Sequence, residues 1–188
     1  MKLTAPDGKE IKKFFVIPDK FKNLISRDME TGGIITDKKN NIYFATITEP
    51  AVYVYNSDFQ FVKKIYSKPY QFNNVERDLS LTGQGDMILD YLHITKDKSF
   101  LWGINDISED LLMLKIFAAG KIKLWILNLA DEKVINDEII INERPLFAKN
   151  GLLYFARQPK IDAKGNMPNP RLLVYKLKES VISGKQKN

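Results

Sequence analysis

The 188-residue chain predicts an all-β fold built from about four similar units of short antiparallel strands. Its apolar residues fall in short runs rich in Ile, Val, Tyr, Phe and Thr, which suit a pleated, half-buried surface. Tight polar turns containing Asn, Asp, Gly and Pro separate these runs. Part of the pattern recurs along the chain, and no long amphipathic helical pattern interrupts it. Together these observations predict small sheets that repeat along the sequence.

The clearest unit lies within residues 40–65, which read NNIYFATITEPAVYVYNSDFQFVKKI. We predict strands at 42–48 and 51–56, separated at Pro50, which cannot donate a hydrogen bond to a strand ladder. A polar turn at 56–58 then leads into a third strand, FQFVKKI. The corner Asn40-Asn41 is typical of the start of a hairpin.

The N-terminal segment repeats the second half of this unit. LTAPDGKEIKKF (3–14) matches VYNSDFQFVKKI (54–65) at a constant offset, without gaps. Leu3 then corresponds to Val54, and the Lys12-Lys13 pair corresponds to Lys63-Lys64. Pro6-Asp7-Gly8 supplies a strong turn signal. The chain therefore opens with a predicted hairpin that lacks the first half of a unit.

A third unit covers residues 111–141. It contains one strand, a turn at 119–120, a second strand ending in Asn128, a turn at 131–132 and a third strand. The segment before it is ambiguous. Residues 87–94 and 99–104 are candidate strands that belong either to an insertion or to another unit.

The stretch DISEDLLML (106–114) begins like a helix cap, with Asp106 and Ser108. We nevertheless expect strand there, because strand-forming runs surround it.

The fourth unit begins with KNGLLYFARQ (149–158) and has a hairpin corner at Asn150-Gly151. It crosses the long loop PKIDAKGNMPNP (159–170) and ends in RLLVYKL (171–177). We take Tyr55, Leu127 and Tyr175 as equivalent positions of successive units. The interval from Leu127 to Tyr175 then fits a blade-like repeat of about 40–50 residues. The interval from Tyr55 to Leu127 is longer, because it includes the ambiguous segment.

Repeated units of three or four antiparallel strands are what a β-propeller requires, because each small sheet stacks on its neighbours around an axis. An up-and-down barrel would also supply strands, but it would not require a repeat of this period. A β-sandwich is the third alternative. We therefore predict a β-propeller or a fragment of one, with about four blade-like units.

The unit from Asp37 to Ile65 follows the pattern D-x-x-N-x-I-Y, then V-Y-V-Y-N, then F-V-K-K-I. It resembles the repeat of NHL-like and TolB-like six-bladed β-propellers, and in particular the propeller proteins abundant in Bacteroidetes, many of which are exported lipoproteins. The resemblance covers residues 1–17 and 31–177, and it is weakest over 66–106. It implies a periplasmic or cell-surface location if a leader precedes this chain.

Six blades of this length would need more than 188 residues. Either the chain is the C-terminal portion of a larger propeller, or a four-unit ring closes by pairing the N-terminal strand with the last unit. We favour the first, with residues 1–180 as one propeller-like domain and 181–188 as a disordered basic tail. Open blade edges would then favour self-association, because native proteins cover unpaired strands.

Composition excludes several classes of function. The chain has no cysteine, so disulfides, thiol chemistry and Cys-containing zinc sites are excluded. No apolar run reaches the roughly 18 residues of a membrane-spanning helix. The net charge is +6, but it comes mostly from lysines scattered beside turns. That distribution is typical of protected strand edges and disfavours a nucleic-acid surface.

No coherent catalytic constellation is present. His93 is the only histidine, so a histidine-based metal triad cannot form. The sequence Gly83-Gln84-Gly85 lacks the context of a phosphate-binding loop. The acidic pairs at 109–110, 131–132 and 137–138 are adjacent in sequence, and adjacent strand residues point to opposite faces. A propeller hydrolase would need acidic and Asn residues around a metal, and the candidates are Asp37, Asp86, Asp90, Asn105 and Asp106.

The loop 159–170 is the strongest candidate for partner contact, because long loops on a rigid β scaffold often carry binding surfaces. Its segment DAKGN lacks the alternating ligands of a calcium loop, so we predict a turn. The candidate contact residues are Arg157, Lys160, Asp162, Lys164, Asn166 and Arg171.

The sequence thus favours a non-catalytic binding or scaffold module without a cofactor, whose ligand is a protein, peptide or carbohydrate. A metal-dependent propeller hydrolase or lactonase and a polyanion-binding protein remain the alternatives. The sequence leaves the enzyme question open while favouring a role without catalysis.

Overall fold

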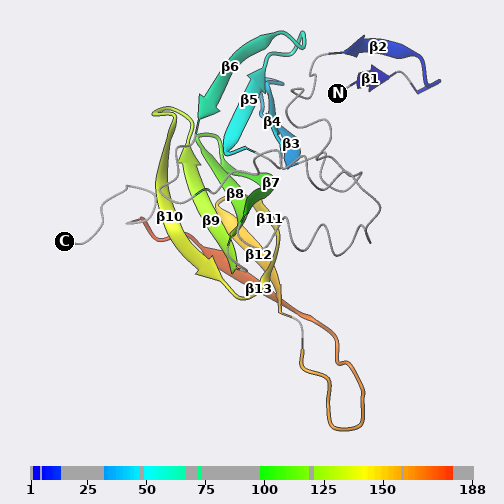
Figure 1. Cartoon of the computed structure of the whole chain (residues 1–188), viewed down its shortest axis with the longest axis vertical. Coiled ribbons are helices and arrows are strands. Elements are labelled where there is room, and N and C mark those ends of the chain that lie inside the picture. Colours follow the sequence, from blue (N-terminus) through cyan, green and yellow to red (C-terminus); the bar gives the residue numbers. More distant parts are fainter. Residues whose placement is uncertain are drawn as a thin grey trace, which may run out of the picture.

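The computed structural model describes residues 2–4, 6–13, 32–46, 49–66, 72, 98–118, 121–157 and 159–179. Within them the chain forms thirteen β-strands in four antiparallel groups (Figure 1). The all-β prediction is therefore confirmed for the described part of the chain. His93, residues 83–85, Asp86, Asp90, the candidate strand 87–94 and the predicted tail 181–188 lie outside the described residues.

The N-terminal hairpin and the first large sheet come from the part of the chain that ends at Tyr66. Strands β1 (Lys2–Thr4) and β2 (Glu10–Lys13) form a two-stranded sheet. The four-stranded sheet that follows has the order β3-β4-β5-β6. Its strands are β3 (Gly33–Thr36), β4 (Ile42–Ala45), β5 (Ala51–Tyr55) and β6 (Phe61–Tyr66).

The middle sheet is also four-stranded, and its strands follow one another in chain order. They are β7 (Ser99–Ser108), β8 (Leu111–Ala118), β9 (Lys121–Asn128) and β10 (Lys133–Ile141). The last sheet has three strands in chain order, β11 (Arg144–Lys149), β12 (Leu152–Arg157) and β13 (Arg171–Lys176).

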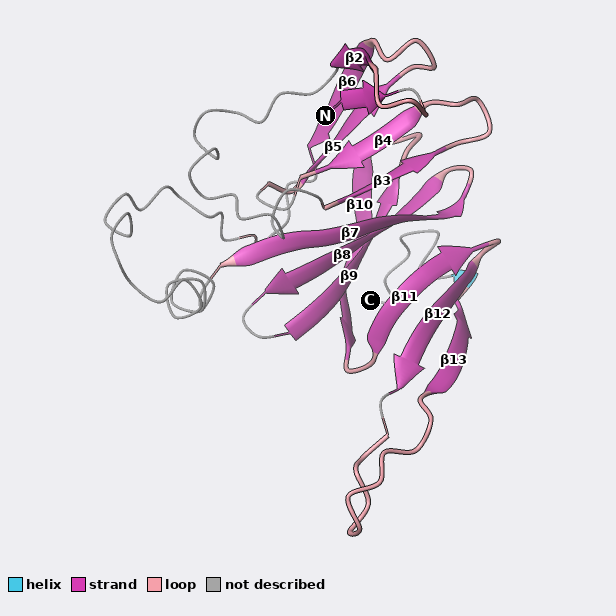
Figure 2. Ribbon diagram, turned by 90° about the vertical axis from the view of Figure 1, so that its right-hand side faces the viewer, coloured by secondary structure: helices cyan, strands magenta, loops and turns pink. Residues whose placement is uncertain are grey.

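The three larger sheets lie face to face in chain order, as Figure 2 shows. Their first strands are neighbours, because β7 contacts β3 on one side and β11 on the other. The contact with β3 is close. A Cβ atom on Gly33 would lie 2.8 Å from Ile104 Cγ2, and Gly33 has a φ of +125° that side chains disfavour.

Two hydrophobic clusters fill the two spaces between these sheets. One cluster joins the first sheet to the middle sheet and includes Val52, Ile65, Leu112 and Leu114. The other joins the middle sheet to the last sheet and includes Met113, Ile126 and Phe155. Successive residues of a strand point to opposite faces, so Leu112 and Met113 enter different clusters. The middle sheet is therefore buried on both faces.

The last sheet covers the middle sheet with one face only. On its other face the rings of Phe147 and Tyr154 stack at 4.4 Å, and Val174 pairs with Tyr154 across the ladder. Leu172 is 60% exposed and Val174 is 49% exposed. This sheet ends the stack among the described residues.

The repeat that relates Leu3 to Val54 is confirmed in the strand register. Leu3 pairs with Lys12, and its counterpart Val54 pairs with Lys63. The register also shifts at the same place, directly after Leu3 in one hairpin and directly after Val54 in the other. The two segments thus form the same bulged hairpin. The prediction that Tyr55, Leu127 and Tyr175 are equivalent is also consistent with the structure, since each lies at or near the end of the third strand of its sheet.

The ambiguity before the third unit is resolved in part. Residues 99–104 belong to β7, the first strand of the sheet that continues with β8, β9 and β10. The stretch 106–114 is strand on both sides of a turn at 109–110, as expected. Two first strands were absent from the sequence prediction. β3 precedes the recognised unit, and β11 precedes the expected start of the fourth unit at Lys149.

Candidate functional site

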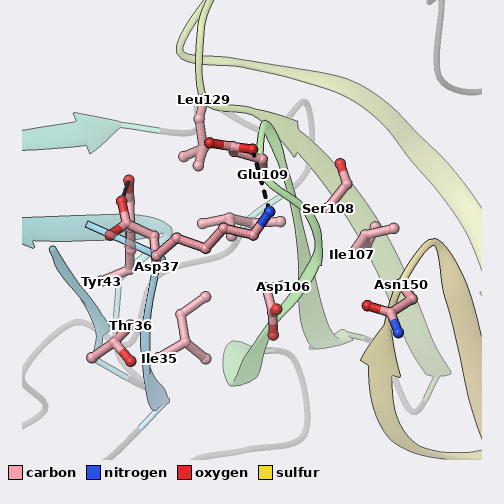
Figure 3. A pocket seen from close by; sticks show the side chains of 12 residues that line it. Ile35, Thr36, Asp37, Tyr43, Asp106, Ile107, Ser108, Glu109, Leu129 and Asn150 are labelled. Atoms are coloured by element: carbon pink, nitrogen blue, oxygen red, sulfur yellow. Dashed lines mark hydrogen bonds and ion pairs between the residues drawn. The ribbon is translucent and has the colours of Figure 1, made fainter. Parts of the chain in front are cut away.

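A cavity of about 490 Å³ opens where the first strands of neighbouring sheets end. Figure 3 shows its lining side chains, which come from the ends of strands and from the turns that follow them in all three larger sheets. Asp37 follows β3, Glu109 lies in the turn between β7 and β8, and Asn150 lies in the turn between β11 and β12. The β11–β12 turn is fixed against β7, because the Gly151 amide donates to the Ile107 carbonyl at 2.7 Å. The meander of each sheet therefore brings corresponding turns to one end of the molecule.

Asp37 organises the first of these turns. One carboxylate oxygen accepts hydrogen bonds from the amides of Lys39 and Asn41, both at 2.8 Å. The other accepts from Asn41 Nδ2 at 2.8 Å and from the Tyr43 hydroxyl at 3.2 Å. Burial would raise the pKa of Asp37, but these hydrogen bonds outweigh it and the pKa is lowered. Burial, together with the charge and hydrogen bond of Asp37, raises the pKa of Tyr43 to about 12. Asp37 is therefore ionised and fully engaged in the turn.

The same five-residue turn occurs two more times in the described part of the chain. Asn56 Oδ1 accepts from the amides of Asp58 and Gln60, and Asp162 Oδ1 accepts from the amides of Lys164 and Asn166. In each turn the fourth residue has a positive φ, namely Asn40, Phe59 and Gly165. The first and fifth side chains are also hydrogen bonded to each other in all three. The three turns thus share an Asp or Asn at the first position and a positive φ at the fourth, and D-x-x-N-x at 37–41 is one instance.

The remaining polar groups of the cavity are less engaged. Lys38 Nζ and Glu109 Oε2 lie 3.7 Å apart, and both side chains are well exposed. Asp106 and Ser108 are exposed at the end of β7, and Asn150 is exposed in its turn. The cavity thus offers a carboxylate, a hydroxyl and an amide beside apolar walls from Ile35, Leu112 and Leu129.

Of the five residues considered for a metal, Asp37 and Asp106 both line this cavity. Asn105 precedes Asp106 on β7, and its buried Oδ1 has no hydrogen-bond partner among the residues that the structure describes. Within the described ranges no three His, Cys, Asp or Glu side chains are grouped as metal ligands would be. The Asp37 carboxylate already accepts four hydrogen bonds, so it has little capacity left for a cation.

The candidate loop 159–170 projects away from the sheets as a narrow extension (Figures 1 and 2). At its base, Arg157 pairs with Arg171 across the ladder, and Arg157 Nη2 donates to Glu143 Oε1 at 2.6 Å. That hydrogen bond lowers the pKa of Glu143 and raises the pKa of Arg157.

DAKGN forms a turn at the tip of this loop, as predicted, and this turn is the third copy of the one at Asp37. Asp162 and Asn166 hold the turn together, whereas the side chains of Lys160 and Lys164 are exposed. The hydrogen bonds from Asn166 lower the pKa of Asp162. Ile161 and Met167 flank the turn, and they are 60% and 65% exposed. The loop and the cavity are therefore separate candidate contact regions.

The sequence prediction missed most residues of the cavity, among them Lys38, Ser108, Glu109 and Asn150. Their common signal is position, because each lies at the end of a unit's first strand or in the turn that follows it. Two of those first strands were not recognised from sequence, so their turns could not be aligned.

A scan of the chain against protein-family models gives no match, and a search of the curated proteins gives none. Within the described ranges, no helix has the length and apolar character needed to cross a bilayer.

Proposed function

We propose that this chain is a non-catalytic binding or scaffold module built on a β-propeller of the NHL-like or TolB-like kind. Three features support the propeller arrangement. Each larger sheet is a meander in chain order, the sheets pack face to face, and their first strands are neighbours. First strands line the axis of a propeller, and the remaining strands of a blade follow outward.

The observation that carries the binding proposal is the cavity shared by turns of successive sheets. A surface assembled from turns on a rigid scaffold is typical of recognition sites. Asp106, Ser108 and Asn150 present acceptors to this cavity without a histidine or a grouped metal site among the described residues. The ligand class is therefore a peptide or carbohydrate segment rich in hydrogen-bond donors.

The test is a binding screen of the purified chain against short basic peptides and neutral oligosaccharides by isothermal titration calorimetry. We expect Asp106→Ala to weaken binding of any hit at least tenfold, the loss of about one charged hydrogen bond. Asp131→Ala is the matched control, because Asp131 is an exposed carboxylate in the β9–β10 turn. The cavity would be refuted as the binding site if both variants lost affinity equally, or if neither variant changed the affinity for the ligands found in the screen.

A metal-dependent hydrolase or lactonase is the second candidate, and one observation favours it: Asp37 and Asp106 line the same cavity. It predicts a rise in melting temperature with calcium, magnesium, manganese or zinc, because a ligand that binds the folded state stabilises it. The binding-module proposal predicts no such rise.

Polyanion binding predicts that the chain is retained on heparin at about 0.3 M salt, whereas the binding-module proposal predicts that it elutes below this salt concentration.

Partner binding through the projecting loop and self-association through the exposed strand β13 belong to the same proposal. Lys160, Lys164 and the exposed Ile161 and Met167 would form the loop contact. Sedimentation of the chain at rising concentration measures self-association. We expect Val174→Lys to reduce any dimer, because Val174 lies on the uncovered face of the last sheet.

A further inference from the structure

A second polar feature lies toward the other end of β7, away from the cavity of the turns. Strands β7 and β11 are in contact, and each contains a β-bulge. Trp102 is the unpaired residue between Leu101 and Gly103, and Leu146 is the unpaired residue between Pro145 and Phe147. Bulges redirect side chains and release backbone groups from the ladder, and they are common beside binding sites.

Lys115 of β8 reaches across this gap. Its side chain lies over Gly103, where a Cβ atom would collide with Lys115 Cε. Its Nζ lies 3.4 Å from the carbonyl oxygen of the bulged Leu146. Lys115 lies on the same face of β8 as Met113, which packs toward the last sheet, so the ammonium is held between two sheets.

Among the described residues, no acidic side chain pairs with the positive charge here. Neither Lys115 nor Arg144 forms an ion pair in the part of the chain that the structure describes. The neighbouring carboxylate, Glu143, is engaged by Arg157. Burial lowers the pKa of Lys115, and the charge of Arg144 lowers it further. Two cations held near each other without an anion would be stabilised by one.

Two aromatic rings lie on the same side of the middle sheet as Lys115. Trp102 is 59% exposed, and its ring meets Phe117 edge-on at 6.1 Å between centroids. Phe117 lies two residues after Lys115 on β8, and alternate strand residues share a face. The exposed side chain of Leu146 lies on the β11 side of the gap.

We propose that Lys115 and Arg144, together with the Trp102 ring, form a binding site for an oxyanion attached to an aromatic or apolar group. The cations would bind a phosphate or carboxylate, and the indole and Phe117 would contact the attached group. This site is independent of the cavity that contains Asp106. If no oxyanion binds here, the function proposed for the cavity is unaffected. If no ligand binds in the cavity, the oxyanion site is likewise unaffected.

Collisional quenching of tryptophan fluorescence tests the cations directly. The chain has two tryptophans, and Trp125 is only 3% exposed, so a dissolved quencher reports on Trp102. An excess of positive charge raises the local concentration of iodide but not of neutral acrylamide. We expect Lys115→Met and Arg144→Gln each to lower the iodide-to-acrylamide quenching ratio about twofold at low salt.

Lys123→Met is the matched control, because Lys123 is a half-buried lysine of β9 that pairs with Ile116 on the other face of the same sheet. It should leave the ratio unchanged. Thermal melting of each variant checks that it folds. An equal ratio in the wild-type chain and the Lys115 and Arg144 variants would overturn the proposal.

Phenyl phosphate and benzoate then distinguish the oxyanion, with inorganic phosphate as the reference. We expect one of the two aromatic anions to protect Trp102 from iodide at concentrations at least fivefold below those needed with inorganic phosphate. Lys115→Met should abolish that difference. Equal protection by inorganic phosphate would indicate an adventitious ion only, and it would overturn the proposal. Protection that survives Lys115→Met would also overturn it.

Discussion

The turn that Asp37 organises can be tested by removing its carboxylate. In Asp37→Ala, the amides of Lys39 and Asn41, the Asn41 side chain and the Tyr43 hydroxyl lose their common acceptor. A net hydrogen bond contributes about 0.5–1.5 kcal/mol, so four contribute about 2–6 kcal/mol. Because the carboxylate is partly exposed and water replaces it in part, we expect the free energy of unfolding to fall by about 2–3 kcal/mol.

Urea denaturation followed by the fluorescence of the buried Trp125 measures this change. With a slope of about 2 kcal/mol/M, the midpoint should fall by about 1–1.5 M. Asp37→Asn should lower the free energy of unfolding by about 1 kcal/mol or less. The reason is that Asn56 accepts the corresponding hydrogen bonds with an amide side chain in the second copy of this turn. Asp162→Ala is the matched control: it breaks the same turn at the tip of the projecting loop, away from the core, and should leave the midpoint unchanged.

The effect should also depend on pH. Asp37 has a pKa below its usual 3.8 in the folded chain. A carboxylate whose pKa is lowered by folding stabilises the fold at pH values above its pKa in the unfolded chain. This contribution is lost as the pH falls through its pKa in the folded chain. The difference in the free energy of unfolding between wild type and Asp37→Ala should therefore reach its largest value above about pH 5. It should shrink as the pH falls below 3.8. Equal midpoints for Asp37→Ala and Asp162→Ala at pH 7, or a difference that grows in acid, would refute this account.

Three further outcomes are expected. Leu114→Ala should lower the free energy of unfolding by about 2–5 kcal/mol, because Leu114 is completely buried between two sheets. Leu172→Ala, at an exposed site, should lower it by less than about 0.5 kcal/mol, and urea denaturation measures both changes. Gly33→Ala should lower the melting temperature by several degrees, because its Cβ would press on Ile104 in a backbone conformation that side chains disfavour; an unchanged melting temperature would contradict the close contact of β3 with β7. In a spectrophotometric titration, Tyr43→Phe should differ from the wild-type chain only above about pH 11, because the Tyr43 pKa is about 12; loss of a transition near pH 10 in this variant would contradict the Asp37 contact.

The sequence predicted the outer parts of the sheets better than their first strands. The match of 3–14 to 54–65 anticipated the β1–β2 hairpin, though not its bulge, because turn residues and alternating strands specify a hairpin locally. β11 was missed because Pro145 and the bulge at Leu146 interrupt its alternation. β3 was missed because it has only four residues and begins at a glycine. The cavity was missed for the same reason, since its residues follow those first strands. Lys115 of the middle sheet reaches the Leu146 carbonyl of the last sheet, and no local sequence pattern reports a contact between residues so far apart in the chain.

The middle sheet is covered on both faces and the last sheet on one, and this difference has a kinetic consequence. In a stack where each layer contacts only its neighbours, opening should begin at the layer with fewer neighbours. Backbone amides of β13 should therefore exchange with deuterium through local opening, and those of β8 and β9 only when the whole stack opens. A protease that attacks transiently opened chain should cut after Arg171 or Lys176 before it cuts within β8. Such an early cut would release the terminal strand while the Trp125 core persists.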